Sequence, residues 1–400
     1  MRTKIVQECS ISFISFTSDK KITSGRTHKD IENFVELFKD AVKEIKVLRL
    51  KPSKELVKYE NVSYHQVLRP FHDKTNLYLR TVSYVICQVS LSIKLMLLGS
   101  DVNFFHVGGT LLLLPILLLK LLGKKVIFIV VGESVDKHYL IFHDTQVEKV
   151  VAKILRTIQN FVLFFLSDSN IFLSRSIAQP YGYANRKTFF TNMNYIDPQK
   201  FDKTKPFRER TIDVIFIGGI NREKGVKELV DSVPLIIQKN SDIKIRVIGA
   251  GPMLQDLKSE VHSKNLNGYI KFLGWVDHSQ LSRHLNEAKF FILPSQTDGL
   301  PKALLEAMSC GTIPIANCVG GVVDVIEEPK NGFLLPNNEP ETIANKIISI
   351  LKKSDEYEEM SDAAREYVLK SHSFAKIKKK YNLILESVLR NGPHVYSRPK

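Results

Sequence analysis

The sequence of 400 residues predicts an α/β protein built from two domains, each a doubly wound parallel sheet with helices on both faces. A chain of this length exceeds what one hydrophobic core usually supports. Short apolar runs alternate with longer amphipathic stretches over most of the chain, which is the pattern of parallel α/β sheets. The composition, 44% hydrophobic and 25% charged, excludes disorder, collagen and a simple coiled coil.

Strands and helices alternate from the N-terminus. Strands are expected at 11–16, 45–50, 102–106, 126–131 and 170–173, and helices at 29–42, 77–98, 111–122 and 147–166. The segment 195–205 is polar and contains Pro198 and several lysines, which is typical of a linker. The first domain is therefore predicted to comprise residues 1–204.

The alternation then restarts in a second domain, residues 205–373. Strands are expected at 213–217, 244–248, 270–272, 290–293 and 313–316. Helices are expected at 226–238, 253–264, 279–288, 303–308 and from 341 onward. Ligands of such folds bind at the carboxyl ends of the strands, so functional residues are expected there.

The strongest apolar run, 107–132, raises the question of a membrane span. Pro115, Lys120 and Gly123 interrupt it, whereas a spanning helix needs about 20 apolar residues without a break. A helix followed by a buried strand is the better interpretation, and a transmembrane helix is the alternative. The N-terminal 21 residues resemble a first strand more than a signal peptide.

Charge and cysteine usage restrict the possible partners. The net charge is +15, of which residues 1–205 carry +12, so the first half is expected to meet an anionic partner or to be a solvated lysine-rich surface. Aromatic residues do not interleave with the basic ones, which argues against nucleic acid. The four cysteines form no Cys-x-x-Cys pair and are typical of a reducing, cytoplasmic compartment, with contact to an anionic inner membrane face left open.

The first motif is FIGGINREKGVKELV, residues 216–230. A strand ends in two glycines, and a helix then opens near Arg222 and Lys224. Backbone amides at a helix N-terminus together with these cations make a site for a diphosphate. An ordinary turn with a solvated lysine is the alternative.

The second motif is PSQTDGLPKALLEAMSCGTIPIA, residues 294–316. Asp298 lies on a turn before a predicted helix, and Glu306 lies two turns into that helix between apolar neighbours. Carboxylates placed in this way can accept hydrogen bonds from sugar and ribose hydroxyls. The alternative is a helix-capping carboxylate with a surface charge.

In this order and at this interval, the two motifs resemble the donor-binding half of retaining glycosyltransferases of family four, the glycosyl transferases group 1. The stretches VIGAGPMLQDL (247–257), FLGWV (272–276) and NGFLLPNNEPETIANKI (331–347) fit the same family. The resemblance is strong over 169–350 and thin before residue 100. It implies the GT-B architecture, two Rossmann-like domains facing a cleft, with the C-terminal helix 374–400 packed back on the first domain.

The resemblance also implies roles for individual residues. Lys224 would bind the donor diphosphate and stabilise the departing phosphate, Asp298 would hold the transferred sugar, and Glu306 would hold the ribose. These three are the expected catalytic residues. The expected donor-binding set is Gly219, Arg222, Lys224, Gly251, Trp275, Val276, Gly299, Leu300, Pro301 and Glu306.

The sequence departs from the family pattern at three positions. Gly219 stands where the family usually has Arg, and Arg222 is the candidate to replace that charge. Asp298 stands where Glu is common. Val131 stands where a His often faces the acceptor, so the acceptor candidates are Gly25, His106 and Glu133, with a structural role for His106 as the alternative.

The implied activity is transfer of a hexose-type sugar from a nucleoside-diphosphate-sugar to a saccharide, glycolipid or lipid-carrier acceptor, in polysaccharide, glycolipid or glycan biosynthesis. No Asp-x-Asp triplet occurs, which favours a mechanism without a metal; no cofactor is expected beyond the donor substrate. The alternatives are a nucleotide-sugar-binding pseudoenzyme and a sugar-nucleotide epimerase of the same fold.

Overall fold

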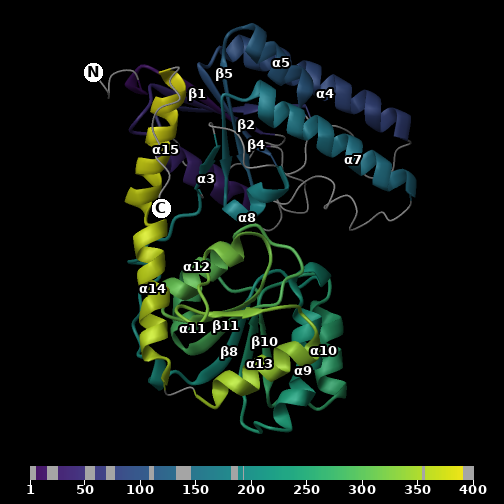
Figure 1. The fold of residues 1–400 in the computed structure, drawn as a ribbon, viewed down its shortest axis with the longest axis vertical. Helices are drawn as coiled ribbons and strands as arrows, with labels where there is room; N and C mark the ends of the chain where they lie inside the picture. Colours follow the sequence, from purple (N-terminus) through teal and green to yellow (C-terminus); the bar gives the residue numbers. More distant parts are fainter. Residues whose placement is uncertain are drawn as a thin grey trace. The chain divides into compact units, whose positions relative to one another are not determined.

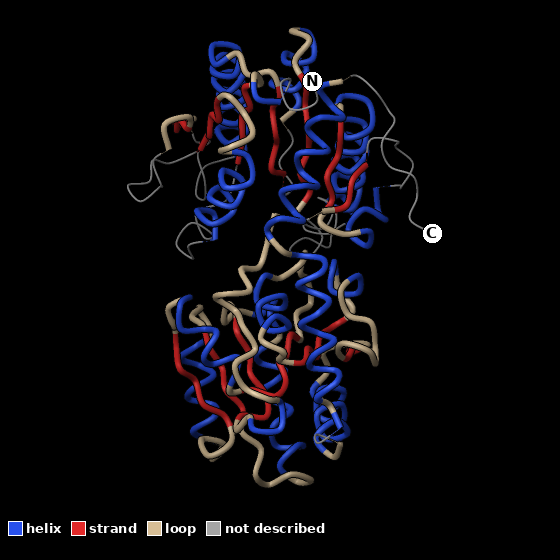
Figure 2. The backbone as a smooth tube through the Cα atoms, turned by 90° about the vertical axis from the view of Figure 1, so that its left-hand side faces the viewer, coloured by secondary structure: helices blue, strands red, loops and turns tan. Residues whose placement is uncertain are grey.

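The computed structural model describes residues 6–15, 26–49, 59–68, 77–107, 112–131, 146–181, 188–191, 193–353 and 356–390. The chain divides into an N-terminal unit, Met1–Asn194 with Ile377–Lys400, and a C-terminal unit, Tyr195–Lys376 (Figures 1 and 2). The boundary lies ten residues before the 204/205 boundary placed from the sequence. The intervening segment packs on the C-terminal unit, where the Thr204 amide donates to Asn286 Oδ1 (2.8 Å) and Lys203 pairs with Glu358 (2.7 Å).

The N-terminal unit contains a seven-stranded sheet in the order β3-β2-β1-β4-β5-β6-β7, with every pair parallel. The strands are β1 (Ser10–Ser15), β2 (Glu44–Arg49), β3 (Val62–Gln66), β4 (Val102–Val107), β5 (Lys125–Val130), β6 (Ser169–Phe172) and β7 (Thr188–Phe190). The five predicted strands are confirmed to within a residue or two. The two strands missed, β3 and β7, lie at the sheet edges, where half-exposed sequences such as VSYHQ lack the continuous apolar run of a central strand.

Helices cover both faces of this sheet. They are α3 (Arg26–Phe38), α4 (Leu77–Leu98), α5 (Leu113–Leu121), α7 (Gln146–Phe161) with a π-helical turn η1 (Val162–Leu166), α8 (Arg175–Ala178) and α15 (Phe374–Leu389). Leu91 of α4, Ile116 of α5 and Leu163 of η1 share one core with Phe105 and Phe128 of the strands, so these helices cover the same face.

Aromatic rings fill the core on the other face. Phe34 of α3 stacks on Phe13 of β1, with ring centroids 4.1 Å apart, and meets Phe104 of β4 at 5.1 Å. The C-terminal helix α15 joins this core, because the fully buried Tyr381 ring lies 5.9 Å from Phe38. This packing places α15 in the N-terminal unit, although it is the last helix in the sequence.

The C-terminal unit contains a six-stranded parallel sheet in the order β10-β9-β8-β11-β12-β13. The strands are β8 (Ile212–Ile217), β9 (Ile245–Ile248), β10 (Ile270–Gly274), β11 (Ala288–Leu293), β12 (Ile313–Asn317) and β13 (Phe333–Leu335). The helices are α9 (Val226–Ile237), α10 (Leu254–Ser263), α11 (Leu281–Asn286), α12 (Lys302–Ser309), α13 (Pro340–Leu351) and α14 (Glu358–His372). The five predicted strands are confirmed. The expected helix 279–288 is shorter, because Asp277 caps a separate 3₁₀ turn before α11 and Ala288 already begins β11.

The apolar run 107–132 contains helix α5 and then strand β5, as predicted. Of the helices in the described ranges, none has a stretch both long and apolar enough to span a bilayer. Lys120 of α5 pairs with Asp168 (2.7 Å), which ties the end of this helix to the start of β6.

Candidate functional site

The strand order of the C-terminal unit brings the two sequence motifs together. Strand β8 ends in the first motif and β11 ends in the second, and these strands are neighbours at the centre of the sheet. Because all strands run parallel, their carboxyl ends lie at one edge, where doubly wound folds bind ligands. The loops that follow β8, β9, β10 and β11 build the candidate site.

Lys224 and Asp298 form an ion pair at this edge. Lys224 Nζ lies 2.5 Å from Asp298 Oδ2, and the two side chains are only 11% and 13% exposed. A second bond joins the same loops, since the Gln296 amide donates to the Glu223 carbonyl (2.9 Å). The ion pair therefore places a cation and a carboxylate, a hydrogen-bond acceptor, side by side, with a small part of each side chain exposed to solvent.

The geometry of the β8–α9 loop orients Lys224. Asn221 caps a one-turn 3₁₀ helix, Arg222–Lys224, by accepting from the Lys224 amide (3.2 Å). Gly225 then takes a left-handed conformation, φ 68°, and starts α9. A Cβ at Gly225 would lie 2.0 Å from the Pro294 carbonyl oxygen, so glycine permits the close approach of the two loops.

Glu306 lies beneath this edge on α12. Its side chain is 4% exposed and accepts a hydrogen bond from His278 Nε2 at 2.7 Å, with Lys302 Nζ at 3.9 Å. His278 comes from the loop after β10 and is 42% exposed. His278 is not among the residues predicted from the sequence; its place just after a predicted parallel strand is the signal that could have indicated it.

The loop after β9 approaches the loop after β8 through backbone contacts. The Ile220 amide donates to the Ala250 carbonyl (3.0 Å), and the Met253 amide donates to the Ile220 carbonyl (3.2 Å). A Cβ at Gly251 would lie 2.2 Å from the Ile220 carbonyl oxygen. The requirement for glycine at Gly251 is thus explained by packing between loops.

The remaining predicted donor residues lie around this edge with different exposures. Trp275 is 71% exposed, whereas Leu300 is buried in the apolar core. Pro301 precedes the first turn of α12 in an extended conformation. Gly219, Val276 and Gly299 are half-buried and Arg222 is exposed, so the structure brings the predicted donor set to the loops of one sheet edge.

The acceptor candidates belong to the N-terminal unit. His106 is the penultimate residue of β4, is 6% exposed, and has its ring 5.7 Å from that of Phe13. Gly25 and Glu133 lie outside the described residues.

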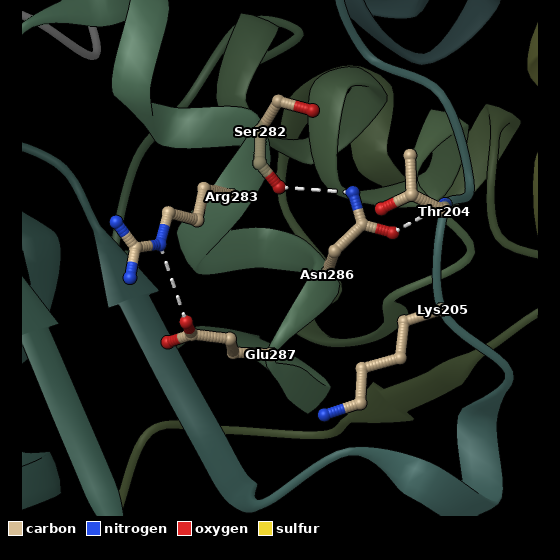
Figure 3. A pocket seen from close by; sticks show the side chains of 6 residues that line it. All are labelled: Thr204, Lys205, Ser282, Arg283, Asn286 and Glu287. Carbon is tan, nitrogen blue, oxygen red and sulfur yellow. Dashed lines mark hydrogen bonds and ion pairs between the residues drawn. The ribbon is translucent and has the colours of Figure 1, made fainter.

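A pocket of about 470 Å³ lies at the opposite edge of the same sheet. It is lined by Thr204, Lys205, Ser282, Arg283, Asn286 and Glu287, and Figure 3 shows Arg283 paired with Glu287 and Asn286 bonded to the main chain of Thr204 and Ser282. These residues precede β8 and β11 in the chain. The pocket is therefore separate from the edge that carries Lys224 and Asp298.

The sheet edge that carries Lys224 and Asp298 has the chemistry for a ligand that is both anionic and rich in hydroxyl groups. Lys224 supplies a cation beside a helix start, which suits phosphate. Asp298 and Glu306 supply carboxylate acceptors, which suit hydroxyl groups. In the described ranges, no three His, Cys, Asp or Glu side chains are grouped so that they could hold a metal ion.

Two solved structures have this fold over nearly the whole chain. Sucrose-phosphate synthase from Thermosynechococcus elongatus has a TM-score of 0.73 at 15% identity, covering 96% of this chain and 100% of that one. Anabaena HepE, solved in complex with UDP-glucose, has a TM-score of 0.70 at 15% identity, covering 95% and 100%. The protein therefore has the GT-B glycosyltransferase fold, as the resemblance implied.

The sequence also matches a family model over part of its length. Residues 197–367 match the model of glycosyl transferases group 1. A curated relative is the amylovoran biosynthesis glycosyltransferase AmsK of Erwinia amylovora, 25% identical over 162 residues. That match covers 39% of this chain and 40% of the relative, so the chain spans less than half the length of AmsK.

Proposed function

We propose that this protein is a retaining glycosyltransferase of family four that moves a hexose-type sugar from a nucleoside-diphosphate-sugar to a saccharide, glycolipid or lipid-carrier acceptor. The Lys224–Asp298 ion pair at the adjacent ends of β8 and β11 carries the proposal. A nucleoside-diphosphate-sugar has a diphosphate next to a sugar. The ion pair offers a cation for the diphosphate next to a carboxylate that can accept hydrogen bonds from the sugar. HepE, which was solved with UDP-glucose, supports a donor of this class.

In the proposed mechanism, the ion pair opens when the donor binds. Lys224 Nζ moves its hydrogen bonds to the diphosphate and stabilises the charge that develops as the phosphate leaves. Asp298 is then free to accept from a sugar hydroxyl, and Glu306 with His278 contacts the ribose. No protein nucleophile is required, because the leaving phosphate takes the acceptor proton in this class, and neither a metal nor a cofactor takes part.

The relative AmsK is named for amylovoran biosynthesis, which favours polysaccharide assembly as the context. We place the enzyme in the cytoplasm. All four cysteines are free thiols, and three of them are buried, as expected in a reducing compartment.

The test is nucleotide-sugar turnover and nucleotide binding. The protein is incubated with UDP-, GDP- and ADP-sugars, and released nucleoside diphosphate is measured with and without EDTA. Release that survives EDTA is expected from one donor class. Glu306→Ala is expected to weaken nucleotide binding by calorimetry at least about tenfold, the cost of a lost charged hydrogen bond.

Glu359→Ala, at an exposed carboxylate near the start of α14, is the matched control and is expected to bind normally. Binding without release from any donor or acceptor would indicate a non-catalytic nucleotide-sugar protein. Neither binding nor release would overturn the proposed function.

A further inference from the structure

The outward sides of three helices in the N-terminal unit are apolar. Among the described residues, 19 large apolar side chains are exposed; 15 of them lie on α4, α5, α7 and η1, and a sixteenth, Leu122, directly follows α5. They are Val82, Val85, Ile86, Val89, Ile93, Met96, Leu97, Leu114, Leu117, Leu121, Leu122, Val150, Ile154, Phe161, Phe164 and Phe165. We call these 16 residues the apolar face.

The apolar face is one surface. On α4 its members recur at intervals of three and four residues, so they form one stripe, and the buried Leu91 and Leu95 lie on the opposite stripe. Helix α5 packs against α4 and also against η1, and all three share a core on the same side of the sheet. In Figure 1, α4, α5 and α7 lie together beside the strands of this unit.

The fold of this unit does not require apolar residues on that side. A helix that covers a sheet needs one apolar stripe facing the core, and a helix apolar all round is ordinarily buried. Contiguous exposed apolar surface of this extent marks a site of contact with a protein or a membrane. The apolar face is therefore expected to be covered when the protein works.

The charges around the apolar face indicate what covers it. By sequence, helices α4, α5, α7 and η1 hold one acidic residue, Glu148, and six basic residues: Arg80, Lys94, Lys120, Lys149, Lys153 and Arg156. Lys120 pairs with Asp168 (2.7 Å). Lys149 and Lys153 are exposed on the same helix as Val150 and Ile154.

Basic residues beside an apolar surface match anionic lipid headgroups over acyl chains. A second copy of the chain would instead bring like charges together, which costs binding energy. We propose that the apolar face docks the N-terminal unit onto the surface of an anionic lipid bilayer, with α4, α5 and α7 lying in the headgroup region. The three phenylalanines at the end of α7 and in η1 would enter the boundary between headgroups and acyl chains, as the Trp, Phe and Leu residues of interfacial helices do. The inference does not rest on the donor site, which belongs to the other unit.

The test is binding of the full chain to lipid vesicles in the absence of nucleotide. Wild type is expected to sediment with vesicles of phosphatidylglycerol and phosphatidylcholine, and far less with phosphatidylcholine alone. Leu97→Gln/Leu121→Gln/Phe165→Gln replaces three exposed members of the face and is expected to lower the partition coefficient by more than about tenfold. Lys149→Gln/Lys153→Gln is expected to lower it about fivefold for each lysine that contacts the headgroups.

The matched control variants replace residues of the same types in the C-terminal unit. Val323→Gln replaces an exposed apolar side chain of the C-terminal unit, and Lys227→Gln/Lys264→Gln removes two exposed lysines there; both are expected to bind vesicles as wild type does. If the triple variant melts early, Leu121→Gln alone, at a side chain 84% exposed, is expected to lower partition about threefold.

Absence of wild-type binding to anionic vesicles, or equal binding by the triple variant, would overturn the inference. So would a wild-type dimer in light scattering that ignores vesicles and becomes monomeric in the triple variant, because the face would then be an interface between copies. Nucleotide binding measured separately shows whether the proposed function fails independently.

Discussion

The two units cover their parallel sheets with helices whose outer sides differ. On the C-terminal unit, Lys227 of α9 pairs with Asp231 (2.6 Å) and with Glu260 of α10 (3.0 Å), and Lys264 pairs with the same glutamate (2.6 Å). On the N-terminal unit, the outer sides of α4 and α5 carry Val, Ile, Leu and Met. The central strands of both sheets are buried in apolar cores. The outer residues are therefore explained by what each surface meets, which is water in one case and, by our proposal, lipid in the other.

The units also differ in the kind of site they hold. The C-terminal unit places buried and half-buried charges at one sheet edge, with Lys224 against Asp298 and Glu306 against His278. At the corresponding strand end of the N-terminal unit, His106 is buried beside Phe13. Substitutions of charged residues should therefore have the larger effect on sugar transfer in the C-terminal unit. Substitutions of apolar residues should have the larger effect on stability and lipid binding in the N-terminal unit.

The largest effect is expected from Lys224→Ala. Loss of a cation that stabilises the departing phosphate should lower kcat/KM for sugar transfer by about 10² to 10³. Lys227→Ala, three residues further on and ion-paired at the surface, should stay within about twofold of wild type, because exposed pairs contribute little. Steady-state kinetics on both variants checks the contrast, and equal losses would contradict the role given to Lys224.

A pair of substitutions on α4 sharpens the comparison of the two helix sides. Leu91→Ala, at a fully buried side chain, should lower the free energy of unfolding by about 3 kcal/mol, the usual cost of a core cavity. Leu97→Ala, at a side chain 78% exposed, should change it by less than about 0.5 kcal/mol. Urea denaturation measures both, and similar costs at the two positions would show that the apolar face is packed in solution.

Gly251→Ala tests the close approach of the loops around the candidate site. The new Cβ would lie 2.2 Å from the Ile220 carbonyl oxygen, so the loops must separate, at a cost of about 1–3 kcal/mol. Weaker nucleotide binding by calorimetry should accompany the loss of stability. Gly268→Ala, where a Cβ meets nothing within 4 Å, should leave both quantities unchanged. Normal nucleotide binding in Gly251→Ala would separate this loop from the site.

The smallest expected effect is the change in the free energy of unfolding with pH that comes from His284. Partial burial and the neighbouring Arg246 guanidinium, 3.0 Å from Nδ1, lower the pKa of His284 below its usual 6.5. The folded state then binds fewer protons than the unfolded state, so this contribution to stability is present above pH 6.5 and is lost as the pH falls toward the folded pKa. The size is about 0.5 kcal/mol or less after solvent screening.

Denaturation at pH 7.5 and 5.5 should show a smaller difference for His284→Gln than for wild type. Partial burial of Glu287 is outweighed by the hydrogen bond from Arg246 and the neighbouring positive charges, which hold the pKa of Glu287 below its usual value, so this carboxylate keeps its charge over the range and does not produce the difference. An unchanged difference would assign the pH dependence to other groups.

Much of the fold could be predicted because the central strands of a parallel sheet are continuous apolar runs. The strands of both sheet centres, and helix α4 to the residue, follow from that pattern. The edge strands β3 and β7 could not, since three to five half-exposed residues resemble a loop. The edge strand β13 could not either, because three residues are too few to show a pattern. Helix α15 is predicted as a helix by its own pattern, but only its contact with Phe38 assigns it to a unit.

The sequence by itself determined the two α/β units, the resemblance of residues 169–350 to a known family, and the candidates Lys224, Asp298 and Glu306, because each depends on residues close together in the chain. Only the tertiary structure decided that Lys224 pairs with Asp298, 74 residues away in the chain, and that His278 forms a hydrogen bond with Glu306. It also decided that α4, α5 and η1 share one core and leave apolar residues of α4, α5, α7 and η1 exposed. The physical reason is common to all three: strand order and helix packing bring distant segments together, and no local pattern records which segments will meet.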